Sequence, residues 1–207
     1  MLQRMSDSRL PAAPRSHARA LRRILGLVSC ALVAVIAAGW VWQQPFMARA
    51  RMSWELTRMP APESILVPVQ GVRARQIADT FGAPRGSDRR HQGVDIFAAR
   101  GTAVIAATPG IVAVISERGL GGRQIWLIGP ARQRHYYAHL EEWAPGLAVG
   151  DVVQPGDVLG AVGDSGNARG TPPHLHYGLY AEAGAIDPLP LMHAATQRPA
   201  TSTDAGK

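Results

Sequence analysis

The chain has 207 residues, of which 46% are hydrophobic, so it is long enough for one domain of ordinary size with flanking segments. Its formal net charge is +7. Residues 1–23 hold six arginines and one aspartate, a local balance of +5, which leaves only +2 for the rest of the chain. The rest of the chain also has no pattern of alternating aromatic and basic residues that would bind nucleic acid. We therefore expect no nucleic-acid partner.

A charge-free stretch follows the basic N-terminus. Residues 24–42 are dominated by Leu, Val, Ile and Ala, and Trp40 and Trp42 lie at its far end. This composition predicts one transmembrane helix with an aromatic residue pair at the interface. Because the arginines precede it, residues 1–23 are predicted to be a basic cytoplasmic segment. The rest of the chain would then face the periplasm or the outside, held to the inner membrane by a single span.

Two alternatives to an uncleaved anchor fit the N-terminus less well. A cleaved signal peptide would use Ala48-Arg49-Ala50, but this site lies well past the end of an apolar stretch longer than a usual signal core. A lipoprotein signal would end at Cys30, which follows Arg23 too closely. We therefore expect the anchor to stay on the protein.

Composition divides the remaining chain into three parts. Residues 43–64 are predicted to be a juxtamembrane linker, in which Met52 to Met59 form a short interfacial helix before Pro60 and Pro62. Residues 65–193 form the globular domain. Residues 194–207 lack apolar periodicity and are predicted to be a disordered tail.

The globular domain is predicted to be mainly β and mostly antiparallel. Its short β-branched runs alternate with Gly- and Pro-containing turns, and the turn at residues 118–122 is expected to connect a hairpin. The predicted strands cover residues 103–106, 111–115, 124–128, 135–139 and 158–162.

Two spaced motifs contain potential metal ligands. In His174-Leu175-His176 the two imidazoles would face the same side of a strand. His91 and Asp95 are four residues apart, and in a straight strand their Cα atoms would be separated by about 13 Å, too far to share one ion. The backbone must therefore bend between them, and we expect Gly93 to permit this bend through a positive φ.

These motifs, together with Tyr137-Ala138-His139-Leu140, occur in the order H-x-x-x-D, Y-x-H-L, H-x-H. In this respect residues 67–187 resemble the lysostaphin/LytM-type zinc metallopeptidases. The resemblance implies an antiparallel β-sheet domain of the duplicated hybrid motif type, here preceded by one N-terminal transmembrane helix. It also implies one Zn²⁺ per chain, held by His91, Asp95 and His176, with His139 and His174 as the catalytic pair.

The chemistry of this residue set agrees with the resemblance. Two neutral imidazoles and one carboxylate leave a fourth tetrahedral position open, as in catalytic zinc sites. One of His139 and His174 would take a proton from water and the other would stabilise the oxyanion. Which of them does which is open. His17 and His193 receive no role, and His135 is expected on the surface of a strand; Tyr136 and Tyr137 are expected to pack, although their hydroxyls could orient a substrate.

We therefore expect a membrane-anchored zinc endopeptidase that hydrolyses peptide cross-links of peptidoglycan in the cell envelope. One alternative is a non-catalytic scaffold or activator of cell-wall amidases, but relatives of that kind usually lack metal ligands. A zinc peptidase with a protein substrate is another. The segment Gly163-Asp164-Ser165-Gly166 also resembles the nucleophile region of chymotrypsin-type serine proteases, but those need two β-barrels and more chain.

Overall fold

The computed structural model describes residues 15–86 and 88–197. The chain forms two compact units, which divide between Met47 and Ala48. The N-terminal unit contains α1 (Arg15–Trp42) and the short 3₁₀ helix η1 (Pro45–Met47). Within α1, Ala20–Trp42 is long and apolar enough to cross a membrane and is not buried against other described residues. It is a candidate transmembrane span, and a signal sequence would share these properties.

The second unit begins with α2 (Ala48–Arg58), which lies in the segment predicted to be a linker. Met52 and Leu56 are buried, and the helix contacts β5 (Gly110–Glu117) and the 3₁₀ helix η3 (Pro130–Arg132). The Arg49 side chain donates hydrogen bonds to the carbonyl oxygens of Gly150 (2.9 Å) and Val149 (3.2 Å). The apolar face of α2 therefore packs on the β domain.

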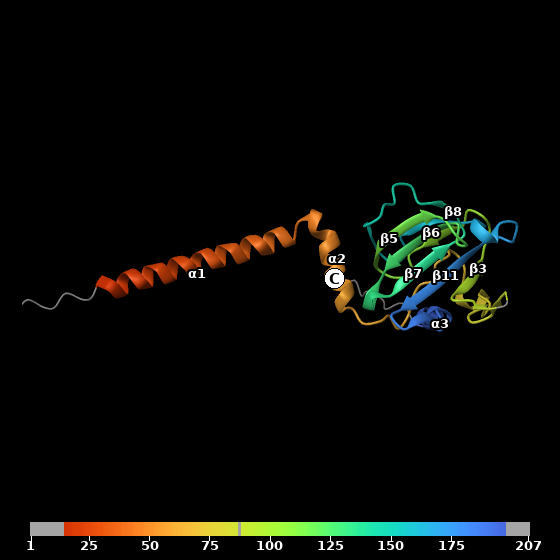
Figure 1. The fold of residues 1–207 in the computed structure, drawn as a ribbon, viewed down its shortest axis with the longest axis horizontal. Coiled ribbons are helices and arrows are strands. Elements are labelled where there is room, and N and C mark those ends of the chain that lie inside the picture. Colours follow the sequence, from red (N-terminus) through yellow and green to blue (C-terminus); the bar gives the residue numbers. More distant parts are fainter. Residues whose placement is uncertain (1–14, 87, 198–207) are drawn as a thin grey trace, which may run out of the picture. The chain divides into compact units, whose positions relative to one another are not determined.

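The larger of the two main sheets contains the candidate site. Its strands follow the order β12-β11-β7-β6-β5-β9, and β3 pairs with β11. Figure 1 shows β5, β6, β7 and β11 side by side, with β3 beside β11. The bounds are β3 (Val94–Phe97), β5 (Gly110–Glu117), β6 (Arg123–Ile128), β7 (Arg134–Ala138), β9 (Val152–Val153), β11 (His174–Ala181) and β12 (Gly184–Ile186).

A second sheet has the order β4-β10-β8, and a separate hairpin joins β1 to β2. The remaining helical elements are two short 3₁₀ helices and a final α-helix. The bounds are β1 (Pro84–Arg85), β2 (Arg89–Arg90), β4 (Ala103–Ile105), β8 (Leu140–Trp143), β10 (Val158–Val162), η2 (Ala74–Gln76), η4 (Gly166–Ala168) and α3 (Leu189–Gln197).

One hydrophobic core joins the two main sheets. It combines side chains of the larger sheet, such as Ile125 and Leu175, with Val104, Leu140 and Leu159 of the smaller one. All of these side chains are fully buried. The mainly antiparallel β fold predicted from the sequence is confirmed.

The predicted strands correspond to β4, β5, β6, β7 and β10, and the turn at residues 118–122 connects β5 to β6. The short strands β1, β2, β3, β8, β9 and β12 were not predicted, because two to four residues give too little alternation to recognise. At the C-terminal end, α3 continues to Gln197, so residues 194–197 of the predicted tail are helical. Residues 198–207 of that prediction lie outside the described residues.

Candidate active site

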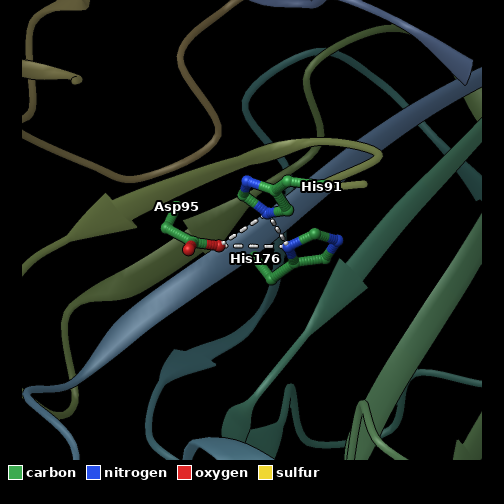
Figure 2. A group of neighbouring side chains, drawn as sticks. All are labelled: His91, Asp95 and His176. Carbon is green, nitrogen blue, oxygen red and sulfur yellow. Dashed lines mark hydrogen bonds and ion pairs between the residues drawn. The ribbon is translucent and has the colours of Figure 1, made fainter. Parts of the chain in front are cut away.

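Antiparallel pairing brings the predicted metal ligands together. In the register of β3 with β11, Asp95 is the direct partner of His176, and His91 lies just before β3. His91 Nε2 is 2.9 Å from His176 Nδ1 and 3.1 Å from Asp95 Oδ1, and His176 Nδ1 is 3.0 Å from the same oxygen. Figure 2 shows the three side chains converging on one point. Asp95 and His176, which are far apart in the sequence, are thus brought together by the pairing of β3 with β11.

The prediction for Gly93 holds only in part. The backbone bends at Gly93 as expected, but its φ is not among the positive values of this chain, so the expected left-handed conformation is wrong. Instead, β3 begins only at Val94, and His91 lies outside the strand. A Cβ at Gly93 would overlap the carbonyl oxygen of Tyr177 and approach His176 Cε1 to 3.0 Å. Glycine is needed here because the two backbones approach closely.

The three donor atoms fit a zinc ion. Zinc bonds to nitrogen and oxygen of about 2.0–2.1 Å place two tetrahedral ligand atoms about 3.3 Å apart. The three separations of His91, Asp95 and His176 are 2.9–3.1 Å, so a small closure of each bond angle accommodates the ion. Two imidazoles and one carboxylate are also a ligand set that catalytic zinc sites use.

Neighbouring groups orient these ligands. His91 Nδ1 donates to the carbonyl oxygen of Thr80 (2.8 Å), which leaves Nε2 as the metal-binding lone pair. The Arg85 guanidinium donates to Asp95 Oδ2, the carboxylate oxygen that does not face the two histidines. Burial by itself would raise the pKa of Asp95, but hydrogen bonds with His176, His91 and Arg85 outweigh it and lower that pKa far below its usual range. Asp95 is therefore ionised and ready to bind a cation.

His139 and His174 lie beside this group. Their ring centroids are 5.1 Å apart, and the centroid of His139 is 6.0 Å from that of His176. His139 Nδ1 is 2.8 Å from the carbonyl oxygen of Ser165, and His174 Nδ1 is 2.8 Å from that of Pro172. In each ring Nδ1–H is the donor, so Nε2 is left as a free acceptor. Burial lowers the pKa of His139 to about 4, and the ring is therefore neutral at pH 7.

Two loops hold His139 in an unusual backbone conformation. Its φ is 65°, in the left-handed region, and its N–H donates to the carbonyl oxygen of Gly121 (2.9 Å). A Cβ on Gly122 would overlap the backbone at Gly166, and a Cβ on Gly166 would overlap that at Gly122. The two loops are thus in direct backbone contact, with no space for a side chain between them. This contact fixes Ser165, the partner of the His139 ring.

The five residues line an open groove of about 650 Å³. One side, the basic wall, consists of Arg85, Asp88, Arg89 and Arg90 from the β1–β2 hairpin. The other side, the loop wall, consists of Leu120, Gly121, Asn167, Ala168 and Thr171. Tyr136 and Tyr180 also line the groove, and burial raises the pKa of Tyr136 to about 12, so its hydroxyl is protonated.

The prediction for His135 is wrong. This residue is fully buried, not on the strand surface, and its Nδ1 lies 2.7 Å from the Tyr177 hydroxyl. Because side chains at i and i+2 share a face, His135 points to the same side of β7 as the buried Tyr137, while Tyr136 points into the groove. Both tyrosines pack as predicted, since Tyr137 is fully buried and Tyr136 stacks on Trp126 with ring centroids 4.3 Å apart. The Tyr136 hydroxyl donates to Gln124 Oε1, and the residue also lines the groove.

Sequence reasoning missed the basic wall. Arg85 contacts the ligand cluster, yet the sequence suggests no role for it, because it lies outside the spaced motifs. The available signal was the number of arginines among residues 85–90, directly before the first motif. Tyr180 and Asn167 were missed as well, and nothing in their local sequence distinguishes them from packing or turn residues.

Several known proteins share this fold and sequence. The catalytic domain of lysostaphin from Staphylococcus simulans is 32% identical, with a TM-score of 0.51, and the match covers 56% of this chain and 91% of that domain. A putative glycyl-glycine endopeptidase lytM from Ruminococcus gnavus is 28% identical with a TM-score of 0.54, covering 70% of this chain and 64% of that one. These structures define the class of fold as that of the lysostaphin-type peptidases.

The sequence profile of peptidase family M23 matches residues 89–188. The L-Ala–D-Glu endopeptidase of Bacillus subtilis is 39% identical over 126 residues, which is 56% of this chain and 39% of that protein. The DD-carboxypeptidase/endopeptidase Mpg of Neisseria meningitidis is 33% identical over 49% of this chain and 22% of that protein. This chain belongs to peptidase family M23, which confirms the resemblance stated from the motifs. It matches less than half the length of these two curated relatives.

Proposed function

We propose that this protein is a zinc-dependent endopeptidase that hydrolyses peptide cross-links of peptidoglycan. The observation that carries the proposal is the convergence of His91, Asp95 and His176 within 2.9–3.1 Å, next to His139 and His174 in an open groove. A non-catalytic scaffold would have no use for three converging donor atoms beside two further imidazoles.

The residues have separate roles in this proposal. His91, Asp95 and His176 would hold the ion, which when bound supplies a Lewis acid that polarises the peptide carbonyl and makes water more acidic. Nε2 of one of the pair His139 and His174 accepts a proton from the attacking water. The ring that accepted this proton, now an imidazolium, stabilises the negative charge that develops on the carbonyl oxygen and then returns the proton to the leaving amine. Nε2 of the other ring accepts a hydrogen bond from the attacking water.

The neutral state of His139 supports this chemistry. His139 donates its Nδ1 proton to a backbone carbonyl, so the opposite nitrogen keeps its lone pair at the pH of the envelope. The same arrangement at His174 leaves a second acceptor 5.1 Å away, measured between the ring centroids. A substrate carbonyl near the three donor atoms would therefore face two proton-accepting nitrogens.

The N-terminal helix supports a location at the membrane. We propose that residues 24–42, within the candidate span Ala20–Trp42, anchor the protein in the inner membrane with residues 1–23 in the cytoplasm, so that the domain meets peptidoglycan on the other side. The names of the relatives specify different bonds, an L-Ala–D-Glu bond in one and DD bonds in another. We therefore propose the class of substrate, a peptidoglycan peptide. The digestion experiment identifies which of its bonds is cleaved.

The test is digestion of purified peptidoglycan by the full chain in detergent micelles, with released fragments identified by mass spectrometry. We expect cross-linked peptides to disappear, a chelator to prevent this, and added zinc to restore it. The His193→Ala variant, altered in α3 outside the groove, serves as a control and should digest normally. A zinc-loaded protein that releases nothing would contradict the proposal and point to an activator of other cell-wall enzymes.

A further inference from the structure

The three arginines of the basic wall differ in how far they are already engaged. Arg85 donates to Asp95 Oδ2, and Arg90 donates to the carbonyl oxygen of Gly82 (3.1 Å). Arg89 is exposed and lines the groove, and its guanidinium group makes no hydrogen bond or ion pair with the described residues 15–86 and 88–197. Of the three guanidinium groups, that of Arg89 is the one available to a ligand.

The register of the hairpin places like charges together. Arg85 is the direct cross-strand partner of Arg89, so the two side chains lie on the same face of the β1–β2 pair. Like charges in directly opposite positions destabilise a hairpin. Asp95 compensates Arg85, and a negative group bound in the groove would compensate Arg89.

The charges are also unequal across the groove. The basic wall carries three arginines and Asp88, a net charge of +2, whereas the loop wall of Leu120, Gly121, Asn167, Ala168 and Thr171 carries no charge. A cleft with one charged side concentrates ligands of the opposite charge and orients them along the groove. Guanidinium groups bind carboxylates through two parallel hydrogen bonds, which makes a carboxylate the anion that fits best in a peptide substrate.

We propose that the basic wall binds a free carboxylate of the substrate peptide and that Arg89 determines this specificity. This inference rests on the proposed function, because it names a feature of the same substrate. Directly opposed residues have Cα atoms about 5 Å apart, and an extended peptide advances about 3.4 Å per residue. Since Arg85 reaches the metal-binding cluster itself, the carboxylate lies within about three residues of the scissile bond.

The probes are two fluorescently labelled peptidoglycan stem peptides that differ in one group. Each has the sequence L-Ala–D-isoglutamyl–L-Lys–D-Ala–D-Ala with an amidated C-terminus, and the glutamate carboxylate is free in one and a neutral carboxamide in the other. Binding to the full chain in detergent is followed by fluorescence anisotropy with a chelator present, which prevents turnover. Cleavage is followed separately with zinc.

We expect the carboxylate peptide to bind about tenfold more tightly than the carboxamide peptide, and this preference to weaken as salt is raised. Arg89→Gln should reduce the preference to less than about threefold by weakening only the carboxylate peptide, and Arg89→Lys should restore part of it. Arg75→Gln, an exposed arginine outside the groove, is the matched control and should keep the full preference.

The outcomes separate the two proposals. Equal binding of the two peptides, absence of binding by either, or an equal loss for both in Arg89→Gln would overturn the carboxylate assignment. Preferential binding without cleavage by the zinc-loaded protein would support the assignment and contradict the proposed endopeptidase activity on this peptide. Cleavage of both peptides at equal rates would support the endopeptidase and overturn the role of Arg89.

Discussion

The two walls of the groove are built in different ways. The loop wall is held by backbone contact between Gly122 and Gly166 and by the bond from the Arg123 N–H to the Ser165 hydroxyl (2.9 Å). The basic wall is held by two strands of two residues each and by the side-chain contacts of Arg85 and Arg90. The wall that orients His139 is close-packed, whereas the wall that offers charge is exposed. Positioning a catalytic group requires the first kind of wall, and attracting a mobile substrate requires only the second.

The largest effects are expected for the histidines between the two walls. Substitution can separate their two proposed roles, metal ligand and proton acceptor. His176→Ala should lose both zinc and activity, because it removes one of three donor atoms. His139→Ala should keep zinc and lose turnover by about 10²-fold or more, because it removes a proton acceptor and no ligand. Metal content by mass spectrometry and the digestion assay measure both, and zinc retained by His176→Ala would refute the ligand assignment.

Next in size is a pair of glycine substitutions, one on each wall. Gly122 has φ +60° and no space for a Cβ, so Gly122→Ala should lower the free energy of unfolding by about 3 kcal/mol and reduce activity through Ser165 and His139. Gly86, in the basic hairpin, has φ +76° but nothing within 4 Å of the added Cβ. Gly86→Ala should cost only about 1 kcal/mol.

Urea unfolding of the two glycine variants checks this prediction, with m-values compared to confirm that only stability changes. Equal losses at Gly122 and Gly86 would mean that the loop wall is no more tightly packed than the basic wall. Activity retained by Gly122→Ala would show that the contact between the loops does not position His139.

His135, on β7, gives the free energy of unfolding a pH dependence of intermediate size. Burial lowers the pKa of His135 to about 4, below the value of 6.5 in the unfolded chain, so the unfolded state binds the proton first as the pH falls. Stability from this group is therefore present above pH 6.5 and is lost on acidification towards pH 4. Between pH 7 and pH 5 the loss is about 2 kcal/mol.

In His135→Gln this part of the pH dependence should disappear, although the variant is less stable at pH 7 because the Tyr177 hydroxyl loses its partner. The measurement is the difference in unfolding free energy between pH 7 and pH 5, with a chelator present so that metal release does not contribute. An unchanged difference in the variant would show that His135 does not titrate in this range.

The smallest effect concerns the hydroxyl of Ser165. Ser165→Ala keeps the backbone carbonyl that accepts from His139 but leaves the Arg123 N–H without its partner. We expect a loss of about 1 kcal/mol in stability and less than a tenfold change in activity. Thermal unfolding and the digestion assay distinguish this from a direct catalytic role, which would reduce activity by far more at unchanged stability.

Much of the fold was predictable because its longer strands have strong local signals. The runs that became β5, β6 and β10 are rich in β-branched and aliphatic residues and are bounded by glycine or proline. The helix α2 was expected at the membrane interface, and the structure places Met52 and Leu56 in the domain instead. An apolar helix face has the same appearance in the sequence whether it is covered by lipid or by protein.

The candidate site was predictable as a set of residues but not as an arrangement. The order and spacing of the motifs are enough to select His91, Asp95, His139, His174 and His176 from the sequence. The bend at Gly93 was predicted, but the reason for glycine there was not, because a close approach to Tyr177 depends on which strand lies alongside. His135 was misplaced for the same reason, since its partner, Tyr177, is on a strand far along the chain.

The sequence by itself determined the chemistry available to this protein: two spaced histidine motifs, one ionisable aspartate, an apolar N-terminal stretch and the membership of a peptidase family that these features indicate. Only the tertiary structure decided that Asp95 pairs with His176, that two glycine loops orient His139, and that Arg89 is left unengaged beside them. The physical reason is that residue types and periodicity are local, whereas strand register and backbone contact are set by the packing of segments far apart in the chain.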